Sequence, residues 1–251
     1  MILTDTIHTA LLHKTPISYS IVRPDSYEKV CLWLHGFGER GEDIRNASDL
    51  EFFAEKYKIA VILPDVPDNY YLDQSWNDCY TEQFLLFELI PAIKTKYNVL
   101  SDKKDLCIAG ISMGGFGSLL LGSHFCDLFS KIVCISGAFI IPDILIGNPE
   151  IIGTFSNNLE YFQNIFGDIP SLENSYSRNP EVAACQALKI KQLPPVFMTC
   201  GTEDMLFTRN VKLRNRLLDS GADVTWKEAG GNHDWKFFNM VLEDVFRWMA
   251  L

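Results

Sequence analysis

Residues 110–114 read Gly-Ile-Ser-Met-Gly and match the pattern G-x-S-x-G, in which a serine stands between two glycines. A serine hydroxyl becomes an effective nucleophile only when a neighbouring base removes its proton. The apolar run 106–109 lies directly before the motif, and small and then apolar residues, 115–121, follow it. This order predicts a strand, a sharp turn and a helix, which together lift the serine above the end of the strand. We therefore expect Ser112 to be a catalytic nucleophile.

The histidines that could act as the base are His8, His13, His35, His124 and His233. The first two precede the core strands, and His124 follows the helix after Ser112, on the wrong side of the sheet. His233 lies in a loop after the last predicted strand, which completes the order nucleophile, acid, base expected for a G-x-S-x-G hydrolase. We therefore expect His233 to be the general base. The alternative is a solvent-exposed loop histidine.

The acid that orients the base should follow the preceding strand. The apolar run 196–199 leads directly into Cys-Gly-Thr-Glu-Asp at residues 200–204. A carboxylate here would hold the imidazole in the correct tautomer and stabilise the imidazolium that forms. We predict Asp204 for this role, with Glu203 as the alternative one position earlier.

Acyl transfer also needs two fixed hydrogen-bond donors for the oxyanion. The backbone N–H of Met113, directly after the nucleophile, is expected to be one of them. The second is expected from the early loop that begins at His35, where the N–H of Phe37, or alternatively of Gly36, could face the reaction centre. His35 itself then has a structural role.

The same loop, residues 36–41, satisfies the dinucleotide-binding pattern G-x-G-x-x-G. Such a site needs an apolar helix that opens at once. Here four charged residues follow Glu39 within the next six positions, and several put negative charge where a pyrophosphate would bind. We therefore expect no nucleotide. The sequence also has no H-E-x-x-H and no C-x-x-C pair, so we expect no metal and no other cofactor.

The chain of 251 residues has a formal net charge of −10, which would repel a phosphate backbone, so we expect no nucleic-acid partner. Its seven cysteines lack paired spacing and are expected to be reduced thiols, most of them in the core. Neither a signal-peptide pattern nor an apolar run of membrane-spanning length is visible. The sequence thus predicts a cytoplasmic protein with no membrane partner, and makes no prediction of oligomeric state.

Short apolar runs alternate with segments of helical period along most of the chain. The predicted strands are residues 17–22, 30–34, 60–63, 106–111, 132–135, 196–199 and 224–227, and the predicted helices are 48–57, 82–97, 113–123, 208–220 and 235–249. The first predicted helix, 48–57, begins at Ser48, which has capping-box spacing to Glu51. Runs that are apolar throughout indicate strands buried on both faces, whereas the first and last strands alternate more and are expected nearer the edges. The alternation predicts an α/β fold with helices on both faces of a mostly parallel sheet.

The stretch from Ala138 to Leu193 breaks this alternation. It is rich in Asn, Ser and Pro, and long irregular segments in compact domains are often lids or binding loops. We expect residues 1–251 to form a single domain, with 138–193 as a lid or substrate-pocket insertion. The alternative is a surface excursion with one or two helices.

Several motifs together resemble the putative esterase (esterase D-like) family of α/β-hydrolases, and within it the tributyrin, feruloyl and acetyl esterase branch. The motifs are residues 34–38, 75–78, 110–115, 136–138, 200–204 and 231–235, and the resemblance covers about residues 30–248. It implies the α/β-hydrolase fold, with the insertion after the sixth strand, and a triad of Ser112, Asp204 and His233. It also implies that Trp76 and Trp235 are walls of the substrate pocket, although ordinary core packing is the alternative for both.

The resemblance further implies a serine carboxylesterase that hydrolyses short acyl or aryl-acyl esters, including acetylated or feruloylated carbohydrates, through an acyl-enzyme. The expected partner is a small-molecule ester. A thioesterase or a small peptidase could use the same triad, but the S-formylglutathione hydrolase branch has a cysteine-containing loop where this chain has residues 36–40. A non-catalytic binding protein of this fold is a further alternative, although such a protein is expected to have lost a triad member and none is missing.

Overall fold

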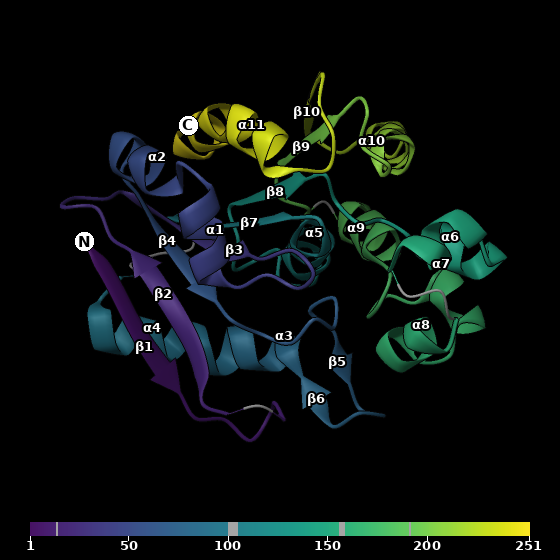
Figure 1. The fold of residues 1–251 in the computed structure, drawn as a ribbon, viewed down its shortest axis with the longest axis horizontal. Coiled ribbons are helices and arrows are strands. Elements are labelled where there is room, and N and C mark those ends of the chain that lie inside the picture. Colours follow the sequence, from purple (N-terminus) through teal and green to yellow (C-terminus); the bar gives the residue numbers. More distant parts are fainter. Residues whose placement is uncertain (14, 100–104, 156–158, 191) are drawn as a thin grey trace.

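An eight-stranded sheet forms the centre of the molecule in the computed structural model, which describes every residue except 14, 100–104, 156–158 and 191 (Figure 1). In spatial order the strands are β1 (Ile2–Ile7), β2 (Ile17–Val22), β4 (Ile59–Pro64), β3 (Lys29–Leu34), β7 (Leu106–Ile111), β8 (Lys131–Ile135), β9 (Val196–Gly201) and β10 (Val224–Ala229). Strands β4, β3, β7, β8, β9 and β10 run parallel to one another, and the pairs β1–β2 and β2–β4 are antiparallel. A separate hairpin pairs β5 (Asp73–Gln74) with β6 (Cys79–Tyr80).

All seven predicted strands are present, and the predicted α/β class is confirmed. Every residue of β4, β7 and β9 is buried, because helices cover both faces of these strands. Strand β10 forms one edge, as its more polar sequence predicted. The other edge is β1, which the sequence analysis missed because every second residue of this strand is exposed and it buries little apolar surface.

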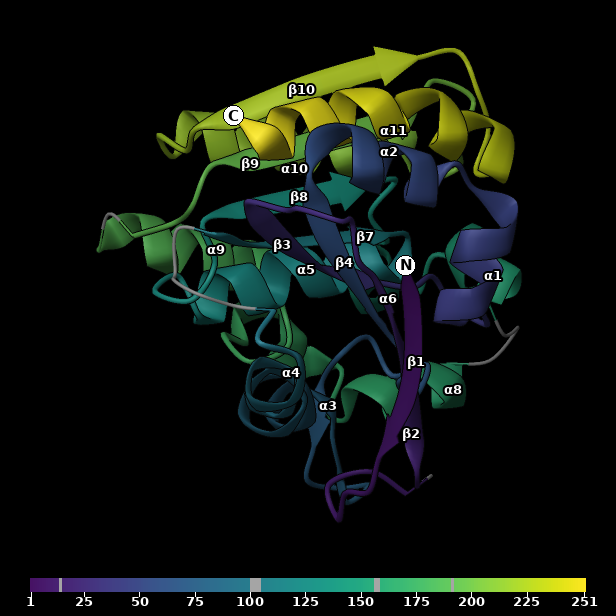
Figure 2. The same cartoon turned by 90° about the vertical axis from the view of Figure 1, so that its left-hand side faces the viewer.

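Helices cover both faces of the sheet. One face carries α1 (Gly41–Ala47), α2 (Leu50–Tyr57) and α11 (Trp235–Ala250), and α11 packs beside α2 (Figure 2). The opposite face carries α3 (Thr81–Gln83), the π-helical segment η1 (Phe84–Leu89), α4 (Ile90–Tyr97), α5 (Met113–His124) and α10 (Phe207–Asp219). Each face therefore has its own apolar core.

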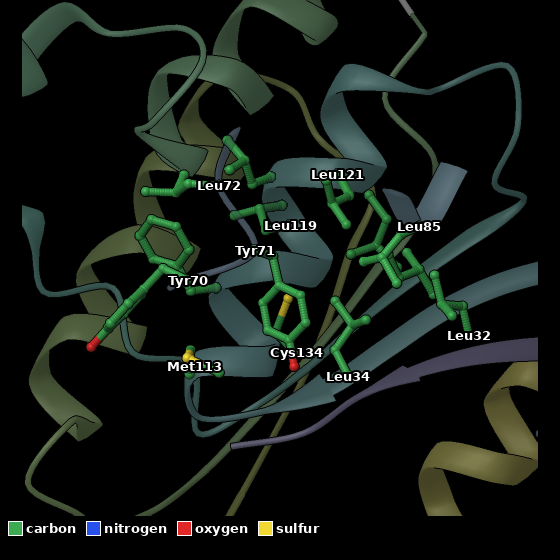
Figure 3. Close-up of a cluster of buried hydrophobic side chains, with 14 of the residues drawn as sticks. Leu32, Leu34, Tyr70, Tyr71, Leu72, Leu85, Met113, Leu119, Leu121 and Cys134 are labelled. Carbon is green, nitrogen blue, oxygen red and sulfur yellow. The ribbon is translucent and has the colours of Figure 1, made fainter. Parts of the chain in front are cut away.

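Helix α5, which follows Ser112, lies in the middle of one core. All its residues except His124 are buried, and a helix that is apolar on every side is stable only in such a place. Figure 3 shows Met113 and Leu119 of this helix in the same cluster as Tyr71 and Leu34. The helix behind the predicted nucleophile is thus held on all sides by packed side chains.

The described part of residues 138–193 is more helical than the sequence indicated. It contains α6 (Ile141–Ile146), α7 (Pro149–Phe155), α8 (Leu159–Phe166), the 3-10 helix η3 (Pro170–Asn174) and α9 (Pro180–Lys189). Helices α6, α7 and α8 gather at one side of the sheet in Figure 1, whereas α9 packs on α5. The elements are short and interrupted by Asn, Ser and Pro, which hid their helical period in the sequence.

Two expectations about helix ends change. Helix α2 begins at Leu50 with Asp49 as its N-cap, so the capping box expected at Ser48 is wrong. The Ser48 hydroxyl instead donates to the carbonyl of Ile44, at the end of α1. The predicted helix 82–97 is continuous, and it contains the π-helical segment η1, which ends just before Pro91. In the part of the chain that the structure describes, no helix is both long and apolar enough to cross a membrane.

Candidate active site

Ser112 stands at the sharp turn between β7 and α5. Its backbone has φ 55° and ψ −115°, a conformation that is strained for any residue with a side chain. Its N–H donates to the carbonyl of Ile135 at 2.9 Å, and its carbonyl accepts from the N–H of Ala138 at 2.9 Å. These bonds to the end of β8 hold the strained turn in place.

The two glycines of the motif are required by close backbone contacts. A Cβ on Gly110 would lie 2.3 Å from the carbonyl group of Gly114, and a Cβ on Gly114 would lie 2.1 Å from the carbonyl oxygen of Leu34. Neither position has room for a side chain, because helix α5 starts directly over β7 and β3. The spacing G-x-S-x-G is therefore a steric requirement of this turn.

Asp204 and His233 meet at the carboxyl edge of the sheet. Asp204 follows β9 and His233 follows β10, and Asp204 Oδ2 lies 2.8 Å from His233 Nδ1. The Asp204 carboxylate is fully buried and also accepts the N–H of Leu206 at 2.8 Å. Burial alone would raise the pKa of Asp204, but the hydrogen bond and the charge of His233 outweigh it and hold this pKa below the ordinary value.

The helix that follows His233 begins at a well-formed cap. Asp234 is the N-cap of α11, and its carboxylate accepts the N–H of Phe237 at 2.9 Å. The ring of Phe238, one turn into the helix, meets the His233 ring edge to face with centroids 5.3 Å apart. The imidazole is thus placed by Asp204 on one side and by α11 on the other.

Glu203 lies beside Asp204 in the sequence but has other partners. Its carboxylate accepts from the N–H of Gly231 and from the hydroxyl of Thr202, and its side chain is exposed. These two donors hold the pKa of Glu203 below its ordinary value. Of the two acids that the sequence left open, Asp204 is the one in contact with His233.

His35 is buried at the end of β3 and does not face the cavity of Ser112. His35 Nε2 lies 3.1 Å from the carbonyl of Val66. The backbone carbonyl of His35 accepts the hydroxyl of Tyr71 at 2.7 Å. Burial lowers the pKa of His35. These contacts tie the loop after β3 to the segment after β4.

The loop after β3 carries the residues considered for the oxyanion. The N–H of Gly36 donates to Glu39 Oε2 at 3.0 Å, so this donor is already engaged. Among the residues that the structure describes, neither the N–H of Phe37 nor that of Met113 donates to a backbone acceptor in a turn, a loop or a neighbouring element. The Phe37 ring meets that of Tyr161 in α8, with centroids 6.2 Å apart.

A cavity of about 340 Å³ joins these elements. Its lining includes Ser112 and His233 together with Gly36, Phe37, Glu39, Ile111, Asp234, Trp235 and Phe238. The predicted nucleophile, base and oxyanion loop therefore open onto one space, which is large enough for a small acyl or aryl group.

The two tryptophans considered as pocket walls differ in position. Trp235 lines this cavity, and its indole N–H donates to Glu39 Oε1 at 3.1 Å. Trp76 is not among the lining residues. Its indole N–H donates to the carbonyl of Asn164 at 3.0 Å, and its ring lies next to the guanidinium of Arg178, so Trp76 contacts the insertion instead.

Glu39 belongs to the site but was not singled out in the sequence as one of its residues. It is partly buried, and both of its carboxylate oxygens accept N–H donors from other parts of the cavity wall. Burial raises the pKa of Glu39 above its ordinary value. The sequence signal that could have indicated it is the position of this acid directly after the glycines of the loop.

No group of three or more His, Cys, Asp or Glu side chains that could hold a metal ion occurs within the described residues. The seven cysteines are all free thiols, and only Cys185 among them is not buried.

A family model described as "Putative esterase" matches residues 14–249, which is nearly the whole chain. The chain belongs to this esterase family. An acetyl esterase from Caldicellulosiruptor saccharolyticus is 30% identical over 226 residues, which cover 88% of this chain and 83% of that protein. The protein is therefore an esterase, as the sequence predicted.

Solved structures of similar proteins confirm the fold of this esterase. An S-formylglutathione hydrolase from Staphylococcus aureus superposes with a TM-score of 0.86 at 20% identity, covering 100% of this chain and 99% of that one. A ferulic acid esterase superposes with a TM-score of 0.79 at 20% identity, covering 100% and 97% of the two chains. At such identities the likeness establishes the α/β-hydrolase fold and leaves the substrate to be argued from the site.

Proposed function

We propose that this esterase is a serine carboxylesterase that hydrolyses short acyl or aryl-acyl esters through an acyl-enzyme. Acetylated or feruloylated carbohydrates are the substrates that we would test first. The observation that carries the proposal is the contact of Asp204 with His233 at a cavity that Ser112 also lines.

In this mechanism His233 Nδ1–H donates to Asp204, which leaves Nε2 to accept the hydroxyl proton of Ser112. The Ser112 oxygen attacks the ester carbonyl, and the carbonyl π electrons move to its oxygen. As the tetrahedral intermediate collapses, the bond to the alkoxy group breaks and His233 returns the proton to the departing alcohol. A water molecule then repeats the sequence on the acyl-enzyme and releases the acid.

The oxyanion of each intermediate would be bound by the N–H groups of Met113 and Phe37. Met113 is the first residue of α5, where backbone N–H groups and the positive end of the helix dipole favour an anion. Phe37 is preferred to Gly36 because the Gly36 N–H already donates to Glu39. Removal of one such donor in other enzymes costs about 10²–10³-fold in kcat, so this pair is a substantial part of the proposed catalysis.

A fluorophosphonate probe tests the proposal directly, because it forms a covalent bond only with an activated serine. We expect labelling of the wild type at Ser112, and loss of both labelling and esterase activity in Ser112→Ala. A folded wild-type protein that resists the probe would contradict the proposal.

The second candidate function, a thioesterase or small peptidase on the same triad, is separated from the first by substrate comparison. Turnover of an acetyl ester, an acetyl thioester and an acetyl amide of matched size should be fastest for the ester. A clear preference for either of the other two would favour the alternative.

A further inference from the structure

Glu39 connects the two halves of the site. Its Oε2 accepts the N–H of Gly36 in the loop after β3, and its Oε1 accepts the indole N–H of Trp235, two residues after His233. Glu39 and Trp235 are 196 positions apart in the sequence, and the Glu39 carboxylate joins the loop to the segment after His233. We propose that Glu39 is a positioning residue that sets the oxyanion loop relative to the general base. The inference rests on the function proposed above.

Glu39 determines which N–H groups of the loop after β3 are free. Because Glu39 engages the N–H of Gly36, the N–H of Phe37 is the one left to face the cavity. The N–H of Glu39 also donates to the carbonyl of Gly36 at 3.3 Å, which closes the turn from both ends. A Cβ on Gly36 would lie 2.7 Å from Glu39 Oε2, so the carboxylate occupies the space that a side chain at residue 36 would need.

The Glu39 carboxylate also affects the charge around His233. Both partners of Glu39 are N–H donors, and an ionised carboxylate accepts from both with full strength, whereas the hydroxyl oxygen of a protonated carboxyl is a weaker acceptor. Burial raises the pKa of Glu39, whereas the two N–H donors and the positive charge of His233 oppose that rise. The ionised group therefore contributes negative charge next to the imidazole, and favours the imidazolium that forms when Ser112 is deprotonated.

Other charged groups surround Glu39 and His233. Asp204 contacts His233 from the loop after β9, and Asp43 in α1 adds negative charge near Glu39. The Arg40 guanidinium is directed to Asp68, at 3.5 Å, and Asp234 caps α11. Glu39 is thus the carboxylate that touches both the oxyanion loop and the helix after the base.

Three variants test the proposal. Glu39→Gln keeps the shape but turns an NH2 group towards one of the two N–H donors, and it removes the charge. Trp235→Phe removes one donor and keeps the charge. Glu42→Gln is the matched control, because Glu42 is an exposed acid in the first turn of α1.

With 4-nitrophenyl acetate we expect Glu39→Gln to lower kcat by about 10- to 100-fold with little change in KM, because small misplacements of a donor have effects of this size. The acid limb of its kcat/KM profile should move to lower pH, because the imidazolium loses a favourable charge. Trp235→Phe should lower kcat by a few-fold and leave the acid limb in place, and Glu42→Gln should behave like the wild type.

The proposal would be overturned if Glu39→Gln had wild-type kcat and an unmoved acid limb. A fall in kcat without any shift of the acid limb would also overturn it, because such a result indicates that Glu39 acts only through packing. Rates of fluorophosphonate labelling separate this inference from the proposed function. If Ser112→Ala is not labelled while Glu39→Gln reacts at the wild-type rate, only the role of Glu39 is wrong. If Ser112→Ala is still labelled, the proposed function is wrong.

Discussion

The ring of Phe37 meets the ring of Tyr161 edge to face, with centroids 6.2 Å apart. Phe37 lies in the loop proposed to bind the oxyanion, and Tyr161 lies in α8 of the segment 138–193. This contact places the insertion next to the cavity that Phe37 lines together with Ser112 and His233. It supports the proposal that the insertion shapes the substrate pocket.

Substitutions of Tyr161 should separate its ring from its hydroxyl. The hydroxyl oxygen is buried and, among the described residues, has no hydrogen-bond partner, so Tyr161→Phe should have wild-type stability or slightly more. Tyr161→Ala removes the ring that supports Phe37 and should lower kcat/KM by about 3- to 10-fold, because an aromatic pair contributes about 0.5–1.5 kcal/mol beyond its buried area. Steady-state kinetics on one short ester would decide, and equal activity of the two variants would contradict the role of the ring.

Substitutions of Asp204 and Glu203 test which of the two carboxylates orients His233. Asp204→Asn should lower kcat by about 10³- to 10⁴-fold, because the amide cannot hold His233 in the tautomer that accepts the proton of Ser112. Glu203→Gln should remain within a few-fold of wild type, since Glu203 contacts Gly231 and Thr202 instead. The measurement is kcat with a chromogenic ester, and a larger loss in Glu203→Gln would reverse the assignment.

Alanine substitutions at Gly114, in the turn after Ser112, and at Gly147, at the end of α6, should differ in their effect on stability. Gly114→Ala forces a Cβ to within 2.1 Å of the Leu34 carbonyl oxygen, so the free energy of unfolding should fall by about 3 kcal/mol or more. Gly147→Ala, at φ +64° with open space around it, should cost only about 1–2 kcal/mol, for the left-handed backbone. Urea denaturation of both variants checks this difference, and similar midpoints would argue against the tight turn.

His124 predicts a pH-dependent contribution to stability. Burial lowers its pKa, but the hydrogen bond and charge of Glu82, whose Oε2 lies 2.6 Å from His124 Nδ1, raise it above the ordinary value. A raised histidine pKa stabilises the fold fully below the unfolded-state value of about 6.5, and this stabilisation is lost as pH rises through the folded-state value. The loss of unfolding free energy in His124→Gln, about 1–3 kcal/mol at pH 6, should therefore shrink at higher pH.

Denaturation curves from pH 5.5 to 9 would measure this effect. Glu82→Gln serves as the control, because it keeps His124 and removes the charge that raises its pKa. The pH dependence of the difference from wild type should be similar in the two variants. A difference that grows with pH would contradict the prediction.

The cavity should favour uncharged esters over anionic ones. Glu39 and Asp234 both line it, and the chain carries a net charge of −10. The wild type should therefore hydrolyse 4-nitrophenyl butyrate faster than 4-nitrophenyl hemisuccinate, a substrate of the same acyl length, by about 3- to 10-fold in kcat/KM. Glu39→Gln should reduce that ratio and Glu42→Gln should preserve it, whereas equal turnover of both esters by the wild type would contradict the expected selectivity.

Much of the fold follows from local sequence pattern. Runs such as 60–63 and 196–199 are apolar throughout, and a strand buried on both faces requires that composition. Strand β1 was not predicted, because an edge strand with alternating exposure gives only a weak signal. The short helices of 138–193 were also obscure, since each is stabilised by packing against its neighbours more than by its own period.

The sequence by itself determined that Ser112, Asp204 and His233 follow strands of one parallel sheet, and chain order alone then puts them at the same edge. The tertiary structure decided which neighbouring group is used: Asp204 contacts His233 where Glu203 does not, and Trp235 lines the cavity where Trp76 does not. It also showed that Glu39 contacts both Gly36 and Trp235, and the contact with Trp235 spans 196 positions. Such choices depend on where side chains of distant segments point, and that is set by the packing of the whole fold.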